Sequence, residues 1–385
     1  MKVRFIDFMK VFFALFLFLK PFYFFSSGTL QIGDICFLLS FSLYLYMVKD
    51  SRMELETIDI PLFLFVASVI LINSIYFLIN TSSDFLVSSI YYIYNLFVII
   101  VFRFLMEEKS IYNLLNRVLK LNLWVQLVAF GVGYGFYAPG RFMGTYNDPN
   151  QMGFGIVTTF ALLLLLNKVY RVKYLWFYYC LSFYLVLTTN SSGMILSILI
   201  LLIAYLLNFY EALNIKGNRI LYWLSGIVAV FSFTLLVILN FQAVSSEFFE
   251  LFSRILYKLE GKSLFKAYIS DRELFPLLNA PEKILYGAGE GMWARYGRGN
   301  EMHATWLSLL FCYGIIPYSL LCTWVYKNIR RSYYSSFVVY LAFFLEGLTL
   351  VNHRQPSFWM LFAFGAIVSS KKASENKNLN GNHLE

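Results

Sequence analysis

The stretch that decides the fold is IPLFLFVASVILINSIYFLIN, residues 60–80, which contains no acidic or basic side chain. A helix rises about 1.5 Å per residue, so about 20 apolar residues cross the roughly 30 Å of hydrocarbon in a bilayer. This stretch therefore predicts a helix that spans a membrane.

Similar stretches recur along almost the whole chain of 385 residues, which is 59% hydrophobic and only 14% charged. Soluble domains carry about 25% charged residues. We therefore predict an all-α polytopic membrane protein, with residues 1–385 forming a single transmembrane domain. Twelve spans are expected, at residues 7–25, 30–48, 60–80, 86–105, 118–137, 151–167, 172–189, 193–208, 219–241, 304–326, 333–350 and 355–370. The first lacks a small-residue cleavage site, so we interpret it as a retained helix.

The basic residues fix the expected orientation. With the N-terminus in the cytoplasm and the spans alternating, 18 of the 31 basic residues fall in cytoplasmic segments and two in short outer loops. Cytoplasmic loops of membrane proteins carry such an excess of lysine and arginine. The orientation places both termini in the cytoplasm. It also explains the net charge of +9, because the basic residues lie mainly in loops that face the cytoplasm at the bilayer. We therefore expect no nucleic-acid partner.

One sizeable segment, residues 242–302, is predicted to lie outside the membrane on the outer face. It carries eight basic and eight acidic residues, so it is not a basic surface patch. Apolar residues at helical spacing predict an amphipathic surface helix over residues 244–260, one of the short helices expected in this segment. Residues 371–385 are predicted to be a disordered cytoplasmic tail.

Unusual polar residues gather on the predicted outer face. The loop of residues 138–153 is rich in proline, glycine and asparagine, which predicts a structured turn. Its only basic residue, Arg141, is expected to meet an anionic partner, although lipid headgroups or loop carbonyls are an alternative. The candidate site residues of the outer face are Arg141, Asn147, Asn150, Arg272, Glu290, Arg295, Arg298, His303, His353 and Arg354.

The residue types indicate the chemistry of this site. Arginine binds phosphate through two parallel hydrogen bonds and stays charged at any working pH. The chain has neither an Asp-x-Asp pair on the outer face nor a His/Cys cluster, so we expect no metal and no cofactor. The four cysteines all fall in apolar stretches, which predicts neither a disulfide nor a zinc site. Because ATP is absent outside the cytoplasm, a pre-activated, lipid-linked diphosphate sugar is the expected substrate.

Three motifs, all on the predicted outer face, carry a resemblance to a known family. They are Arg141-Phe142-x-Gly144 with Asn147-x-Pro149-Asn150-x-x-Gly153, Asp271-Arg272 with Gly287-x-Gly289, and His303 with Gly314. In this order they resemble the O-antigen polymerase and O-antigen ligase superfamily of bacterial polysaccharide glycosyltransferases. The resemblance extends to the expected twelve spans, cytoplasmic termini and large outer loop before the last three spans.

The resemblance implies a GT-C-like architecture in the bacterial inner membrane, with a periplasmic active site. It implies an inverting, metal-independent transfer from an undecaprenyl-diphosphate-linked glycan donor to a glycan acceptor. A chain-length regulator protein is a further partner that it suggests. Arg141 and Arg272, with Arg295 or Arg298, would hold the diphosphate, and His303 or Glu290 would accept the proton of the attacking hydroxyl.

Three functions stay open. A polymerase would join repeat units, whereas a ligase would transfer the glycan to lipid A-core. Ala304 follows His303, and Gly193 stands where the family often has an arginine, which favours the polymerase over the ligase. A transporter or flippase is the third. The chain shows no internal repeat, and Glu346, an acidic residue within a predicted span, is the best argument for this function.

Overall fold

The computed structural model describes residues 4–25, 31–49, 57–137, 140–213, 264–297 and 299–381. Most of these residues are helical, and the one sheet among them is a two-stranded hairpin. Three predicted features lie outside the described residues, namely the span 219–241, the surface helix at 244–260, and Arg298. The first long helices are α1 (Phe5–Leu19), α2 (Ile32–Val48), α3 (Ile60–Asn80), α4 (Asp84–Met106) and α5 (Ser110–Gly131). After the hairpin of β1 (Phe136–Tyr137) and β2 (Arg141–Phe142) come α6 (Pro149–Val169), α7 (Leu175–Thr188) and α8 (Ser192–Leu213).

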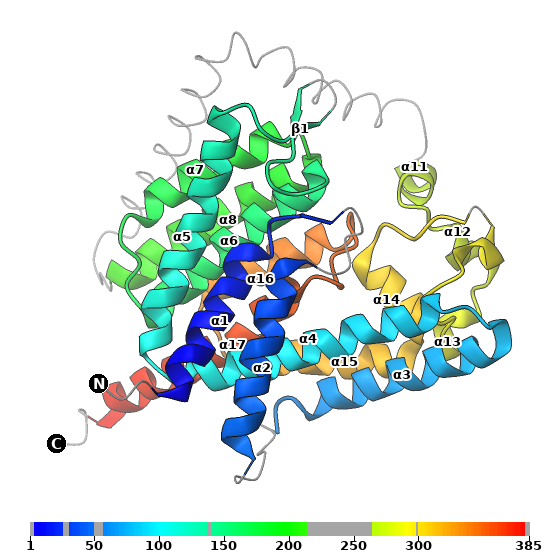
Figure 1. Cartoon of the computed structure of the whole chain (residues 1–385), viewed down its shortest axis with the longest axis horizontal. Coiled ribbons are helices and arrows are strands. Elements are labelled where there is room, and N and C mark those ends of the chain that lie inside the picture. The colour runs from blue at the N-terminus through cyan, green and yellow to red at the C-terminus, as the bar shows by residue number, and fades with distance from the viewer. Residues whose placement is uncertain are drawn as a thin grey trace.

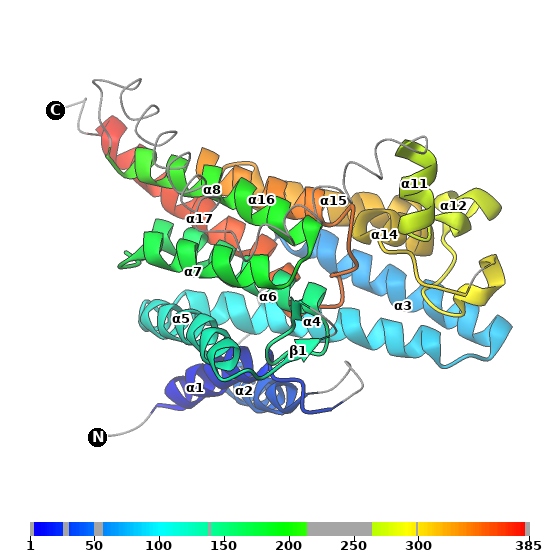
Figure 2. The same cartoon turned by 90° about the horizontal axis from the view of Figure 1, so that it is seen from above.

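The second half of the chain begins with short helices and ends with long ones. The elements are α11 (Leu264–Asp271), α12 (Phe275–Asn279), α13 (Lys283–Tyr286), the 3₁₀ turn η1 (Trp293–Tyr296), α14 (Thr305–Tyr313), α15 (Ile315–Ile329), α16 (Tyr334–Glu346) and α17 (Pro356–Gly381). Helices α3 and α4 form a long hairpin, and the short helices α11 to α13 gather near its tip (Figure 1). The start of α1 and the end of α17 both lie toward the other end of the long axis (Figure 2).

Four described helices are long and apolar enough to cross a membrane by length and composition, namely α3, α4, α6 and α8. Helix α6 is an interior helix and α3 a peripheral one. Of the most apolar stretch of each helix, 78% is buried in α6 and only 28% in α3. The exposed face of α3 carries Leu71, Leu78 and Ile79, which are 62%, 77% and 68% exposed. A contiguous apolar surface of this kind is unfavourable in water, so the fold is that of an all-α membrane protein.

The described helices do not show the predicted count of twelve spans. Helices α2, α7 and α16 are apolar but shorter than 18 residues, although they coincide with predicted spans. The predicted span 304–326 is not one helix, because Gly314 divides it into α14 and α15. At the C-terminal end, the predicted disordered tail begins as a helix, since α17 continues to Gly381.

The break at Gly314 has a steric reason. Gly314 has a φ of +77°, which favours glycine, and an added Cβ would lie 2.8 Å from both Gly287 N and Leu285 O. The backbone of 287–289 reaches the end of α14, where the amides of Ala288 and Gly289 donate to the carbonyl of Cys312 at 3.0 and 2.9 Å. Two glycine motifs that are distant in sequence therefore form one packing contact. A helix continuing through Gly314 would lose it.

The start of α6 explains the Asn-x-Pro-Asn motif. Asp148 caps the helix, with its Oδ1 accepting from the backbone amides of Asn150 and Gln151 at 2.8 and 3.2 Å. Pro149 occupies the first turn, where its missing N–H costs nothing. In the described part of the predicted turn, residues 140–153, strand β2 is followed by the start of α6. The first turn of α6 thus places Asn150 and Gln151 in the lining of a cavity.

Candidate functional site

The main cavity of the described residues, of about 710 Å³, lies where α1, α2, α4 and α6 meet the segments that precede α14 and α17. Its polar and charged lining consists of Lys20, Asp34, Tyr91, Tyr94, Asp148, Asn150, Gln151, Glu301, His303, Asn352, Arg354 and Gln355. A second cavity shares some of this wall, but its volume of about 70 Å³ is too small for a sugar. The larger cavity brings together three of the predicted site residues, His303, Asn150 and Arg354.

Arg354 stands between two carboxylates at the edge of this cavity. Its Nη2 is 2.6 Å from Glu290 Oε1 and 2.7 Å from Glu301 Oε1, while its Nε donates to Glu290 Oε1 at 2.9 Å. The side chain is 30% exposed, and the guanidinium also lies over the ring of Tyr91. Burial lowers the pKa of Arg354, but the charges of Glu290 and Glu301 outweigh this effect and raise it.

Glu290 does not line the cavity but lies behind Arg354, with only 1% of its side chain exposed. Its second oxygen, Oε2, accepts from the hydroxyls of Tyr92 and Tyr313 at 2.7 and 2.6 Å. Burial raises the pKa of this carboxyl, but the charge of Arg354 and hydrogen bonds from its neighbours hold it well below the usual range. Glu290 is therefore an ionised, fully hydrogen-bonded anchor for Arg354 and is not placed to receive a proton from a substrate.

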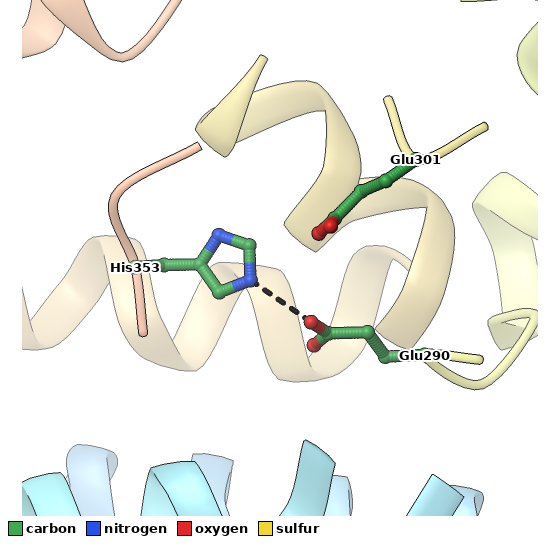
Figure 3. Close-up of side chains that lie close together, drawn as sticks. All are labelled: Glu290, Glu301 and His353. Carbon is green, nitrogen blue, oxygen red and sulfur yellow. Dashed lines mark hydrogen bonds and ion pairs between the residues drawn. The ribbon is translucent and has the colours of Figure 1, made fainter. Parts of the chain in front are cut away.

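His353 completes the surroundings of Glu290. Its Nε2 lies 3.2 Å from Glu290 Oε1 (Figure 3). Its ring stacks on Tyr92, and its carbonyl accepts from Trp359 Nε1 at 2.6 Å. The side chain is fully buried, and Nδ1 has no hydrogen-bond partner among the residues that the structure describes. A neutral imidazole that donates through Nε2 fits these contacts. His353 thus supports Glu290 and does not reach the cavity.

Glu290, Glu301 and His353 offer ligand atoms within 4.8 Å of one another, a spacing that suits a metal ion (Figure 3). The position between the two carboxylates is taken by the Arg354 guanidinium. A cation bound there would have to displace Arg354 and leave it unpaired beside a second positive charge. Glu290 and Glu301 are therefore better explained as the two carboxylates that hold Arg354 than as ligands of a metal ion.

His303 is the imidazole that faces the cavity. The segment before α14 positions it, because its backbone amide donates to the carbonyl of Arg272 at 2.8 Å. The His303 side chain is exposed and lines the cavity. Every carboxylate among the described lining residues is already engaged by a cation, a tyrosine or a helix cap. His303 is thus the accessible base of the cavity.

Arg272 lies beside His303 without lining the cavity. Its Nη1 donates to the carbonyl of Thr349 at 2.5 Å, which joins the end of α11 to the α16–α17 connection. Burial lowers its pKa despite the charge of Asp271. Among the described residues, no carboxylate lies within ion-pairing distance of its guanidinium, so part of its charge is available to an anion.

Arg141 is held next to the cavity by strand β2. Its Nε donates to the carbonyl of Thr189 at 3.0 Å and its Nη2 to Asn150 Oδ1 at 3.1 Å. The predicted anionic partner is not among the described residues, and the loop-carbonyl alternative matches the contact with Thr189. Asn150 lines the cavity, whereas Asn147 is exposed and does not.

Arg295 has a different surrounding from the other arginines. It lies over the rings of Tyr76 and Phe85 and donates to the carbonyls of Ala288 and Gly291 at 3.0 and 2.9 Å. These contacts brace the glycine segment that positions Glu290. Arg295 is therefore a structural residue here, away from the cavity.

A second charged pair on the cavity was not among the predicted site residues. Lys20 Nζ contacts both oxygens of Asp34 at 2.7 and 2.8 Å, and Tyr94 donates to the same carboxylate at 2.5 Å. Lys20 and Asp34 fall inside the predicted spans 7–25 and 30–48. Charged residues at such positions often mark a functional site, so this signal was present in the sequence.

The lining combines two cations with three carboxylates, together with four amides and two tyrosines. Amides and carboxylates offer many donors and acceptors, and aromatic rings offer flat apolar faces. This combination suits a hydroxyl-rich molecule.

The chain matches no protein-family model and no curated protein sequence. Its function must therefore be argued from the site itself.

Proposed function

We propose that this protein is a glycosyltransferase that joins undecaprenyl-diphosphate-linked oligosaccharide repeat units, an O-antigen polymerase of the bacterial inner membrane. The observation that carries the proposal is that His303, Arg354 and Asn150 share one cavity of about 710 Å³. The motifs that resemble the polymerase and ligase superfamily come from three separate parts of the chain. Asn150 and His303 from these motifs line the cavity. Arg141 donates to Asn150, and the carbonyl of Arg272 accepts from the backbone amide of His303.

In the proposed reaction, the acceptor hydroxyl attacks the anomeric carbon of the donor sugar. A new bond forms between this carbon and the acceptor oxygen, and the bond to the diphosphate oxygen breaks. The configuration inverts, and undecaprenyl diphosphate leaves with the bonding electrons. His303 accepts the hydroxyl proton, because its side chain is exposed on the cavity. The glycan would occupy the lining of amides, carboxylates and tyrosines.

The diphosphate would contact Arg354, with Arg141 and Arg272 at the periphery. Arg354 is held from behind by the buried Glu290 and from the cavity side by Glu301, whose side chain is 25% exposed. A phosphate that approached Arg354 would replace Glu301, while Glu290 kept the guanidinium in position. Stabilising the charge of a departing diphosphate in this way is a large contribution to catalysis.

The proposal includes a periplasmic site, twelve spans and cytoplasmic termini, as the distribution of basic residues indicates. A chain-length regulator protein is a proposed partner.

A transporter is the second candidate, and one observation favours it. Glu346 is 2% exposed, and it accepts a hydrogen bond from Asn352, which lines the cavity. Its Oε2 has no partner, and no cation is paired with it in the described part of the chain. A buried carboxyl of this kind suits proton coupling. A ligase would use the polymerase chemistry with lipid A-core as acceptor.

Deleting the gene in its host and examining the lipopolysaccharide by gel distinguishes these functions. Core with a single repeat unit is the expected result and indicates a polymerase. Core alone indicates a ligase or a flippase and contradicts the proposal. If Arg272→Ala and His303→Ala both restored full-length chains to the deletion strain, the proposed site would be wrong.

A further inference from the structure

A third cavity, of about 560 Å³, lies at the opposite end of α6 from the candidate site. It is formed by the end of α6, the turn into α7, the last turns of α8, and α17. Its lining consists of Asn167, Val169, Tyr170, Arg171, Val172, Leu175, Trp176, Tyr205, Asn208, Phe209 and Lys371. Asn150 and Val169 belong to the same helix, so the two cavities lie roughly 30 Å apart along its axis.

The charge of this cavity is positive. Arg171 and Lys371 line it, and its described lining residues include no aspartate or glutamate. The Arg171 side chain is exposed and forms no hydrogen bond or ion pair within the described ranges. The nearby carboxylate of Glu211 interacts with other residues. Its Oε2 contacts Lys168 Nζ and Ser335 Oγ, both at 2.5 Å. The described lining therefore combines two cations with no carboxylate.

Hydrogen bonds hold the polar wall of the cavity in place. Asn167 Oδ1 accepts from the backbone amide of Val172 at 2.9 Å, and its Nδ2 donates to Asn208 Oδ1 at 3.2 Å. Lys371 Nζ donates to the carbonyl of Lys168, which fixes the ammonium at the C-terminal end of α6. These contacts hold the turn that carries Arg171 against α8 and α17.

The remaining wall is apolar and open to the outside of the bundle. Trp176 is 59% exposed and Phe209 is 54% exposed. Tryptophan is enriched at the level of lipid headgroups, because its ring is amphipathic. A ligand with an anionic head and a hydrocarbon chain fits cations and exposed aromatic side chains placed side by side.

We propose that this cavity binds the phosphate headgroup of an anionic phospholipid, with Arg171 and Lys371 on the phosphate and an acyl chain along Trp176 and Phe209. The proposal does not depend on the reaction at the other cavity. It fits the basic end of the bundle, where an anionic membrane surface attracts lysine and arginine.

The test uses the purified full-length protein in detergent, titrated with dioleoyl phosphatidylglycerol or dioleoyl phosphatidylcholine and followed by native mass spectrometry. Phosphatidylglycerol is expected to bind more tightly. Each charge near a membrane surface contributes enough for about a five-fold change, so Arg171→Gln with Lys371→Gln should weaken binding about 25-fold. Arg171→Lys keeps the charge and should keep most of the binding, which separates charge loss from misfolding.

Lys173→Gln is the matched control, because Lys173 is an exposed basic residue two positions away that does not line the cavity. It should leave binding unchanged. Equal affinity for the two lipids, or an equal loss in the control, would overturn the proposal. Displacement of phosphatidylglycerol by an equimolar amount of inorganic phosphate would indicate a site for free phosphate and overturn the lipid assignment.

Discussion

Arg354 binds the carboxylate of Glu290 through two nitrogens, Nε at 2.9 Å and Nη2 at 2.6 Å, although 64 residues separate the two in the sequence. The pair links the glycine-rich segment before η1 to the connection between α16 and α17. Glu290, one of the predicted catalytic groups, therefore supports Arg354, which is one of the two cations that line the cavity.

Replacing Glu290 by glutamine should destabilise the protein. The substitution keeps the shape but removes the charge that compensates Arg354, and breaking one partner of a buried pair costs about 3–5 kcal/mol. Thermal unfolding in detergent measures the effect. Glu282→Gln, an exposed glutamate in the same part of the chain, is the control and should leave the melting temperature unchanged. Equal melting temperatures for Glu290→Gln and wild type would contradict the buried pair.

The same carboxylate predicts a pH dependence of stability. The pKa of Glu290 is lower in the folded state than its ordinary value of 4.5, so the folded state binds fewer protons than the unfolded state. Its contribution to the free energy of unfolding is therefore complete above pH 4.5 and is lost as the pH falls through the folded pKa. Melting temperatures between pH 7 and pH 3 should fall more steeply for wild type than for Glu290→Gln. Parallel curves would rule out this linkage.

Glu301→Gln should strengthen binding of the lipid-linked donor. Glu301 neutralises Arg354 from the cavity side at 2.7 Å, and its removal frees that nitrogen for a phosphate oxygen. We expect KM for the donor to fall roughly 2- to 5-fold with little change in kcat, since an exposed ion pair is worth about 0–1 kcal/mol. Polymerisation assays with purified repeat units measure both constants, with Glu282→Gln as control. A higher KM would mean that Glu301 contacts the substrate itself.

His303→Ala should reduce kcat by roughly 10²- to 10⁴-fold, the usual contribution of a positioned general base. Because the side chain is exposed, the melting temperature should stay within experimental error of wild type. His383→Ala, in the polar C-terminal segment, serves as the matched control for losing a histidine. Activity that survived in His303→Ala at the level of this control would assign proton transfer to another group.

Gly314→Ala should destabilise the break between α14 and α15. The added Cβ would meet backbone atoms of Leu285 and Gly287 at 2.8 Å, and the positive φ is unfavourable for alanine. Gly131→Ala is the control, because beyond its own helix no atom of the described residues lies within 4 Å of a Cβ added at Gly131. Thermal unfolding should show a lower melting temperature only for Gly314→Ala. An unchanged value would mean that the 287–289 segment moves aside without loss.

The membrane helices could be predicted because their signal is local. The uncharged run at residues 60–80 defines α3 with the same bounds that the structure gives it. The prediction of one continuous span at 304–326 was wrong because it also relied on the local signal alone. Its composition is apolar throughout, and the break at Gly314 depends on a backbone contact with Gly287 that no local pattern contains.

The candidate site divides in the same way. Residue type and order singled out His303, Asn150 and Arg354, which the fold brings to one cavity. The role of each residue in this set could not be predicted from the sequence. Glu290 and His353 are buried and support other residues, and Arg295 packs on aromatic rings. The pair of Lys20 and Asp34 was visible as charges in apolar helices, but its place on the cavity was not.

By itself, the sequence determined the class of the protein, an all-α membrane protein, and the set of polar residues from which a site is built. Hydrophobicity and charge act over a few helical turns, so they can be read along the chain. Only the tertiary structure decided which of these residues face the cavity and which hold others in place. Hydrogen bonds and ion pairs such as Arg354–Glu290 act over less than about 4 Å, and distant segments come that close only after the helices have packed.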